Sequence, residues 1–351
     1  MNNMIERIID KLISERSLTV DEYEELLVSR TPEIQERLRQ EADAIRHRVY
    51  GNKVFIRGLI EISNICKNNC LYCGIRGGNG NCDRYRLTRE EILACCRSGY
   101  KLGFRTFVMQ GGEDGYFTDD VLCPLIEEIK SLYPDCAVTL SLGERSRESY
   151  QRLYRAGANR YLLRHEAISS ELYSRLHPKE LNIENRVRCL KDLKEIGYQT
   201  GCGFMVGAPY QTLRHIAEDL KFIEEFKPQM CGIGPFIPHK DTEFKDYPKG
   251  SAELTCYLLS IVRIISPAIL LPATTALGTA ENDGRERGIL SGANVVMPNL
   301  SPVDVREKYA LYDNKISTGA ESADNIRALS DKMKSIGFAI VTERGDYKEN
   351  K

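Results

Sequence analysis

Hydrophobic and polar positions follow a helical period through the first fifty residues. The stretch IERIIDKLIS is amphipathic at this period, and SLTVDEYEELL adds a start signal, with Thr19 or Asp21 in position to cap a helix. The longer stretch TPEIQERLRQEADAIRHRVYG has Pro32 near its first turn and ends at Gly51. The pattern therefore predicts a helical extension over residues 1–50.

After residue 50, short runs rich in β-branched residues alternate with helical patterns, which predicts a parallel sheet with helical crossovers. The expected strands cover 54–63, 105–112, 137–143, 159–166, 200–209, 230–238, 269–276 and 293–299. The expected helices cover 88–103, 118–133, 144–157, 182–197, 211–226, 252–265 and 284–292. Gly103, Gly157 and Gly197 stand where three of these helices should stop.

Eight strands separated by helices of this length are typical of a (β/α)8 TIM-type barrel, which takes roughly 250 residues. We expect the barrel over residues 51–315, with an open doubly wound sheet as the competing fold. We expect residues 316–351 to form a short C-terminal extension packed on the barrel, with a helix over 322–337 and a strand over 338–345. In a barrel, chemistry lies at the carboxyl ends of the strands.

Composition narrows the class of protein. Hydrophobic residues make up 42% of the 351, so a sizeable core can form, and the formal net charge of -1 gives no support for a nucleic-acid partner. No apolar run reaches the roughly 18 residues of a membrane helix, and the first residues lack the features of a signal peptide. We expect a cytoplasmic protein with no membrane partner, in which most of the 12 cysteines are small buried hydrophobes.

Three of the cysteines stand together after the first predicted strand, at Cys66, Cys70 and Cys73 in CKNNCLYCGIR. A structural zinc site takes four ligands, and Cys82 is the only nearby candidate for the fourth. A 4Fe–4S cluster is also held by thiolates, and with three of them one iron keeps an open position. The barrel would place this triplet at its mouth.

The spacing C-x3-C-x2-C, with Tyr72 before the last cysteine, resembles the signature of radical S-adenosylmethionine (SAM) enzymes. The resemblance implies one 4Fe–4S cluster on the three cysteines, with the open iron chelated by SAM. It also implies reduction by an external one-electron donor and cleavage of SAM to methionine and a 5′-deoxyadenosyl radical. The stretch MQGGED is similar to the Gly-rich element of that family, so Gly111, Gly112 and Glu113 would meet SAM.

Further peptides resemble the HydE family of FeFe-hydrogenase maturases, over residues 50 to 315. They are RYRLTREEI at 84–92, TLSLGE at 139–144, RYLLRHE at 160–166, ENR at 184–186, MVGAPYQT at 205–212, GIGPFIPHKDT at 232–242, PATTALGT at 272–279 and GANVVMPN at 292–299. The resemblance implies that Glu166 and Arg186 grip SAM, joined by Glu144. It implies a substrate cavity lined by Arg164, Thr274, Thr275, Met297, Tyr309 and Tyr312.

The substrate implied by this family is a cysteine-bound iron with carbonyl and cyanide ligands, an Fe(CO)2(CN) precursor supplied by the maturase HydG. Its product would enter the di-iron subcluster of the hydrogenase. This chain departs from some HydE proteins because no cysteine follows Cys256, which predicts a single cluster. Two other hypotheses stay open: a radical SAM enzyme acting on a small amino acid, like methylornithine synthase or biotin synthase, and a non-enzymatic metal-binding barrel.

Each candidate also has a structural interpretation. Arg164 and Glu166 share a strand face by alternation and could form only an ion pair, while Arg186 could be a surface charge. Thr274 and Thr275 could be ordinary strand residues, and both can reach one ligand only if the strand has already ended. His165 should point out of the barrel, and His239 is expected to cap or support a loop.

Overall fold

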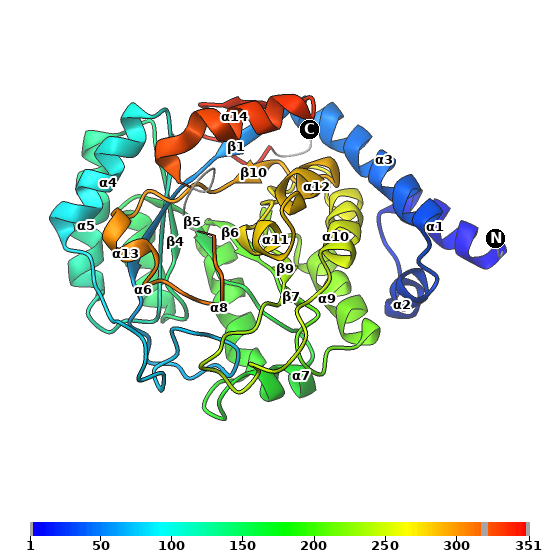
Figure 1. Cartoon of the computed structure of the whole chain (residues 1–351), viewed down its shortest axis with the longest axis horizontal. Helices are drawn as coiled ribbons and strands as arrows, with labels where there is room; N and C mark the ends of the chain where they lie inside the picture. Colours follow the sequence, from blue (N-terminus) through cyan, green and yellow to red (C-terminus); the bar gives the residue numbers. More distant parts are fainter. Residues whose placement is uncertain (1–2, 317–321, 349–351) are drawn as a thin grey trace.

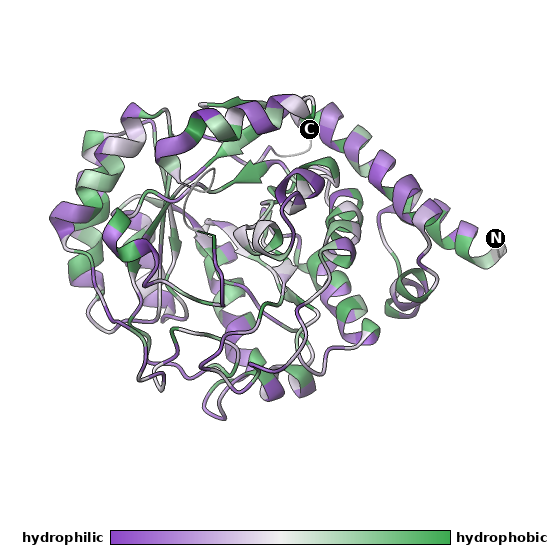
Figure 2. Cartoon of the chain, in the orientation of Figure 1, coloured by the Kyte–Doolittle hydropathy of each residue, from purple (hydrophilic) through white to green (hydrophobic). Residues whose placement is uncertain are grey.

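The structure of the chain is a computed structural model that describes residues 3–316 and 322–348. Helices surround a group of parallel strands, and the N-terminal helices lie to one side (Figure 1). Among the described residues, no helix is long and apolar enough to cross a membrane. Most of the long helices turn a polar side outward and an apolar side toward the strands (Figure 2).

Three helices form the N-terminal extension, as predicted: α1 (Asn3–Glu15), α2 (Val20–Val28) and α3 (Pro32–Tyr50). Thr19, rather than Asp21, caps α2, in a capping box with Glu22. Pro32 begins α3 and Gly51 ends it with φ +65°, which a glycine adopts without strain. Helix α2 packs on α9 (Leu213–Phe226) and α3 packs on α10 (Ala252–Ile265), so the extension covers outer helices.

Six parallel strands form the main sheet, which confirms the predicted α/β class. In spatial order they are β2 (Gly58–Ser63), β3 (Thr106–Gly111), β4 (Ala137–Ser141), β5 (Ala158–Leu162), β6 (Gln199–Cys202) and β8 (Met230–Cys231). The helices between them are α4 (Arg89–Lys101), α5 (Asp119–Leu132), α6 (Arg147–Arg155), α7 (Ser170–Leu176), α8 (Ile183–Ile196) and α9. Gly103, Gly157 and Gly197 follow α4, α6 and α8 with positive φ, as the sequence predicted.

The first predicted strand, 54–63, is divided into two, which corrects the sequence interpretation. Strand β1 (Lys53–Ile56) lies between β10 (Val295–Val296) and β11 (Ala339–Val341), whereas β2 pairs with β3. The chain changes sheets at Arg57 and Gly58, where a Cβ on Gly58 would lie 2.1 Å from Leu300 Cδ1. Gly58, an isolated glycine inside the strand pattern, was the available signal of this change.

The predicted strand 269–276 is also wrong as a regular strand. Only single parallel bridges form there, from Leu270 to Met230 and from Pro272 to Val295. Pro272 has no N–H for a ladder, and Thr274 already caps helix α11 (Thr275–Ala280). Two other predicted strands are broken, and their second halves, β7 (Met205–Val206) and β9 (Gly234–Pro235), pair with each other.

The C-terminal part returns to the strands. After α12 (Gly284–Leu290) and α13 (Val303–Arg306), a 3₁₀ turn η2 (Ala323–Asn325) leads into α14 (Ile326–Ser335), close to the predicted helix. Strand β11 then pairs with β1 in parallel. The predicted extension 316–351 includes 317–321 and 349–351, which lie outside the described residues.

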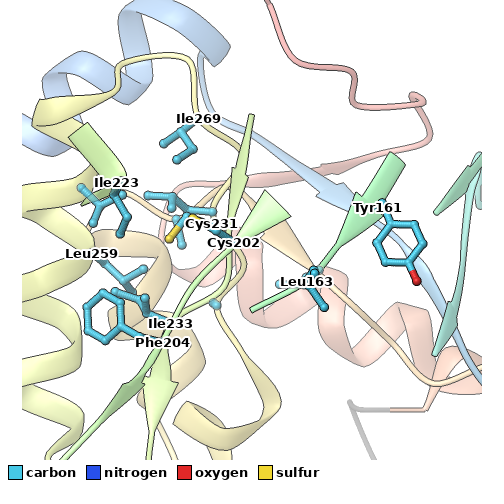
Figure 3. Packing of buried hydrophobic residues seen from close by; sticks show 14 of the residues in the cluster. Tyr161, Leu163, Cys202, Phe204, Ile223, Cys231, Ile233, Leu259 and Ile269 are labelled. Atoms are coloured by element: carbon cyan, nitrogen blue, oxygen red, sulfur yellow. The ribbon is translucent and has the colours of Figure 1, made fainter. Parts of the chain in front are cut away.

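The core between sheet and helices contains several of the scattered cysteines. Cys202 and Cys231 are fully buried beside Ile223 and Leu259 (Figure 3). All twelve cysteines are free thiols, and seven of the nine outside the triplet are buried. The expectation that most of them act as small hydrophobes is therefore confirmed.

Candidate functional site

The three cysteines lie in the long loop between β2 and α4, at the carboxyl end of the first strand of the main sheet. This loop has little regular structure, so many of its carbonyl groups need donors from elsewhere. Arg84 supplies them, because its guanidinium donates at 2.5–3.1 Å to the carbonyl oxygens of Asn64, Ile75, Arg76 and Asn79. One side chain thus holds both ends of the loop that carries the thiols.

The thiols share a half-buried environment that favours a bound cation. Burial raises the pKa of Cys66, and burial together with Cys66 raises the pKa of Cys70 to about 12. Burial and the neighbouring Cys70 likewise raise the pKa of Cys73. These groups become thiolates most readily when positive charge is bound beside them.

No three His, Cys, Asp or Glu side chains of the described segments are placed to hold a single metal ion. Ligands of an iron–sulfur cluster bind separate irons and need not converge on one point. Soft thiolates are the donors that such a cluster takes, so the triplet fits it.

The Gly-rich element after β3 touches the cysteine loop directly. The Glu113 N–H donates to Cys66 Sγ at 3.4 Å, and the Lys67 N–H donates to the Glu113 carbonyl at 3.0 Å. A Cβ on Gly112 would lie 2.3 Å from the Ile65 oxygen, so only glycine fits between the two loops. The Glu113 carboxylate accepts the Glu144 N–H at 3.1 Å and lies 3.2 Å from Lys67 Nζ. Both the backbone and the side chain of Glu113 therefore tie the Gly-rich element to its neighbours, and this element lies directly against Cys66.

The charged residues after β4 and β5 pair differently from the simplest expectation. Glu144 binds Arg186 at 2.5 Å, and Arg186 also donates to the Arg164 carbonyl at 2.6 Å. Arg186 is buried, not a surface charge; burial acts to lower its pKa, but Tyr173 and Glu144 outweigh this and raise it.

Glu166 pairs instead with Arg164, at 3.1 Å, in the ion pair that the alternation predicted. The strand ends at Leu162, however, so these two residues lie beyond it and strand alternation does not place them. The 3.1 Å contact joins Arg164 Nη2 to Glu166 Oε2, and among the described residues Arg164 Nε is buried without a hydrogen-bond partner. Buried polar atoms of this kind suit a polar ligand such as SAM or an anion.

Tyr72 is held by a histidine, His177, that no sequence pattern singled out. His177 Nδ1 lies 2.9 Å from the Tyr173 carbonyl, which only accepts, so Nδ1 carries the proton. Nε2 therefore accepts from the Tyr72 hydroxyl at 3.2 Å. Burial lowers the pKa of His177 to about 3, which keeps this ring neutral. Helix α7, which carries Tyr173 and precedes His177, was not predicted.

The expected substrate residues are only partly gathered. Thr274 accepts the Leu277 N–H at 3.3 Å as a helix cap, and Thr275 begins α11, so the strand has ended before both. Tyr309 is buried, and its hydroxyl accepts from Gln110 at 3.3 Å. Met297 packs in an apolar cluster with Met230, and Tyr312 is half-buried in the segment after Tyr309.

Two polar clusters beside the site were not found from the sequence. Asp114 accepts two hydrogen bonds from Arg86, each at 2.8 Å, and one from Ser63 at 2.7 Å. Burial acts to raise the pKa of Asp114, but these partners outweigh it and lower the pKa. The repeated arginines of RYRLT were the available signal for this cluster.

The second cluster centres on Glu61, which is fully buried on β2. Its carboxylate binds Lys315 and accepts from Asn299 at 2.8 Å. Lys315 also donates to the Tyr309 carbonyl at 3.0 Å, so it ties the segment after Tyr309 to the sheet. Nothing in the local sequence around Lys315 indicates this role.

The two singled-out histidines lie at the edge of the site. His165 is fully buried against α9, as expected for a residue that points away from the strands' interior. His239 supports its own loop, accepting the Asp241 N–H at 3.1 Å through Nδ1. A Cβ on Gly74 would lie 2.3 Å from His239 Cδ2, so this loop packs directly behind the last cysteine.

Comparison with known proteins shows the family of the chain. The sequence model of the Radical SAM superfamily matches residues 60–223, which run from β2 into helix α9. The chain belongs to this superfamily and is a radical SAM enzyme, whose members use a 4Fe–4S cluster and SAM.

Within the superfamily, the chain is similar to the FeFe hydrogenase maturase subunit HydE of Thermotoga maritima. The two are 46% identical over 309 residues, which cover 88% of each chain. Among solved structures, methylornithine synthase (PylB) superposes with a TM-score of 0.82 at 26% identity, covering 95% of this chain and 97% of that one. HydG, a maturase of the FeFe-hydrogenase, superposes with a TM-score of 0.81 at 20% identity, covering 96% and 76%.

Proposed function

We propose that this enzyme acts on a small cysteine-bound Fe(CO)2(CN) complex during assembly of the di-iron subcluster of FeFe-hydrogenase. The observation that carries the proposal is the 46% identity to HydE over 88% of the chain. A maturase of the HydG kind would supply the substrate, and an external one-electron donor would reduce the enzyme. We place this oxygen-sensitive chemistry in the cytoplasm.

The residues of the chain divide into three proposed tasks. Cys66, Cys70 and Cys73 hold the cluster and leave its fourth corner for SAM. When bound, the cluster supplies the electron that cleaves SAM to methionine and a 5′-deoxyadenosyl radical. The backbone of Gly111, Gly112 and Glu113, the Tyr72 ring and the side chains of Glu144, Glu166 and Arg186 position SAM.

The third task is substrate binding. Arg164 offers a half-buried cation beside Glu166, and its buried Nε lacks a hydrogen-bond partner in the described residues, which suits a cyanide or carboxylate group. Thr274, Thr275, Met297, Tyr309 and Tyr312 would line the rest of the cavity. The chain's part in the reaction is to orient the bound groups and exclude water, and no general acid or base is required of it.

We also propose that the strands close into a (β/α)8 barrel over 51–315, flanked by the extensions 1–50 and 316–351. Single parallel bridges support closure: they join Met230 to Leu270, Pro272 to Val295 and Leu59 to Asn299. A closed ring would shield a radical from solvent. The absence of cysteine after Cys256 supports a single cluster.

The amino-acid alternative is favoured by the structural likeness to methylornithine synthase. A hydrogenase-activation assay separates the two functions. Hydrogenase produced without this chain should stay inactive, and adding wild-type chain, but not the Cys70→Ala variant, should restore activity. Full activation without the chain would reject the maturase function. One zinc per colourless chain would favour the metal-binding alternative instead.

A further inference from the structure

A buried histidine–aspartate pair lies behind the segment that carries Arg164 and Glu166. His165 and Asp219 are both 0% exposed, and His165 Nε2 lies 3.2 Å from Asp219 Oδ1. The His165 ring also packs edge-on against Phe222 of α9, with centroids 4.9 Å apart. The pair therefore sits on the helix side of the sheet, away from the residues assigned to SAM.

Hydrogen bonds fix the tautomer of His165. The Gly203 N–H donates to His165 Nδ1 at 3.2 Å, so Nδ1 is an acceptor and the proton is on Nε2, facing Asp219. Asp219 Oδ1 also accepts the Ile168 N–H at 2.7 Å. Asp219 Oδ1 therefore contacts the chain both before Glu166, at His165, and after it, at Ile168.

Glu166 itself has a backbone that a side chain rarely adopts. Its φ is +64°, in the left-handed region, a strained conformation that a non-glycine residue keeps only when its surroundings hold it. The Glu166 N–H donates to the Gly203 carbonyl at 3.0 Å, and Glu166 forms a bridge with Phe204. This conformation leaves the carboxylate 11% exposed, with Oε2 at 3.1 Å from Arg164 Nη2.

Burying the His165–Asp219 pair in the core carries a desolvation cost. Burial raises the pKa of Asp219, although His165 opposes this, and Asp219 Oδ2 has no hydrogen-bond partner among the described residues. Two apolar side chains of similar size would fill the space without that desolvation cost. Buried polar groups that break the packing rule in this way are expected where function needs them.

We propose that Asp219, acting through His165 and the Ile168 N–H, is a positioning residue that holds Glu166 in its left-handed conformation and presents the carboxylate to SAM. The inference rests on the SAM-binding role proposed for Glu166. Neither His165 nor Asp219 touches SAM, so losing the pair weakens SAM binding and leaves turnover at saturating SAM nearly unchanged.

The test compares matched variants of the cluster-loaded enzyme under anaerobic conditions, with iron content and melting temperature recorded for each. Asp219→Leu removes both acceptor oxygens and should raise the Kd for SAM by about tenfold or more. Asp219→Asn keeps one oxygen toward His165 and Ile168 and should stay within about threefold of wild type. His165→Phe fills the same space without the ring nitrogens and should match Asp219→Leu, which keeps the test decisive if the leucine variant does not fold.

A double variant separates positioning from general stability. In a Glu166→Ala background, Asp219→Leu should leave the Kd for SAM nearly unchanged. It should still lower the melting temperature by as much as it does in the wild-type background. Full additivity of the two losses in affinity would overturn the inference, as would unchanged affinity in both Asp219→Leu and His165→Phe. If Glu166→Ala alone leaves SAM affinity unchanged, the SAM-binding role of Glu166 fails and the inference with it, whatever the hydrogenase assay shows.

Discussion

At the scale of single residues, the site depends on residues whose surroundings allow only one tautomer or only a glycine. His177 has one ring nitrogen on the Tyr173 carbonyl and the other on the Tyr72 hydroxyl. Gly112 has no room for a Cβ between the Gly-rich element and the cysteine loop. Neither constraint is visible in the sequence, because Tyr72 is distant from His177, and the cysteine loop is distant from Gly112, along the chain.

The neutral state of His177 predicts a pH dependence of stability. Its pKa is lowered to about 3 in the folded chain, mainly by burial, whereas an unfolded imidazole titrates near about 6.5. Between about pH 6.5 and pH 3, His177 is protonated in the unfolded chain but stays neutral in the folded chain. The free energy of unfolding therefore falls by up to about 1.4 kcal/mol for each unit that the pH is lowered in this range. Denaturant unfolding at pH 6 and pH 5 should show this extra loss in wild type and not in His177→Gln. Equal losses would contradict the assignment.

The contact at Gly112 predicts a severe effect from one methyl group. Its Cβ would lie 2.7 Å from Cys66 Cβ, so Gly112→Ala must push the two loops apart. We expect at least about a tenfold loss of SAM cleavage, together with reduced iron per chain. Gly115→Ala is the matched control, because a Cβ there meets nothing within 4 Å. Normal iron content and activity in Gly112→Ala would show that the loops do not need this close approach.

At the scale of elements, local signals predicted the helices better than the strands. Thr19, Pro32 and Gly197 act where the sequence placed them, because caps and stops are properties of neighbouring residues. The strand run 54–63 was misread because its division depends on pairing with β10, β11 and β3, all distant in sequence. The cysteine triplet was predictable from spacing, whereas the pairing of Arg186 with Glu144 depends on where the fold places α8 relative to the loop after β4.

The cysteine loop predicts a strong dependence on Arg84. Removing the guanidinium leaves four carbonyl groups without this donor, at about 1–3 kcal/mol for each one that stays buried and unsatisfied. Arg84→Met should therefore lose most of its cluster, measured as iron and visible absorbance per chain. The control Arg97→Met changes an exposed arginine of α4 and should keep both. Equal iron in the two variants would mean that the loop holds itself.

At the scale of the whole molecule, segments distant in sequence complete the structure around the site. Strand β11 pairs with β1, and Arg160 on β5 donates to the Asp346 carboxylate at 2.7 Å. On the opposite side, Lys315 links the segment after Tyr309 to Glu61. The C-terminal residues therefore contact both the amino end and the carboxyl end of the strands. The sequence predicted the helix and strand of this extension but not these attachments, since one is a strand pairing and two are charge pairs between residues distant along the chain.

The central claim is that three thiolates hold a 4Fe–4S cluster whose fourth corner is kept for SAM. The most direct measurement is electron paramagnetic resonance of the reduced, cluster-loaded chain during a SAM titration. The account predicts a saturable change in the cluster's g-values in wild type. It also predicts that in Glu166→Ala the same change needs about tenfold or more SAM to reach its midpoint. A cluster signal that SAM leaves unaltered in the wild-type chain would contradict it.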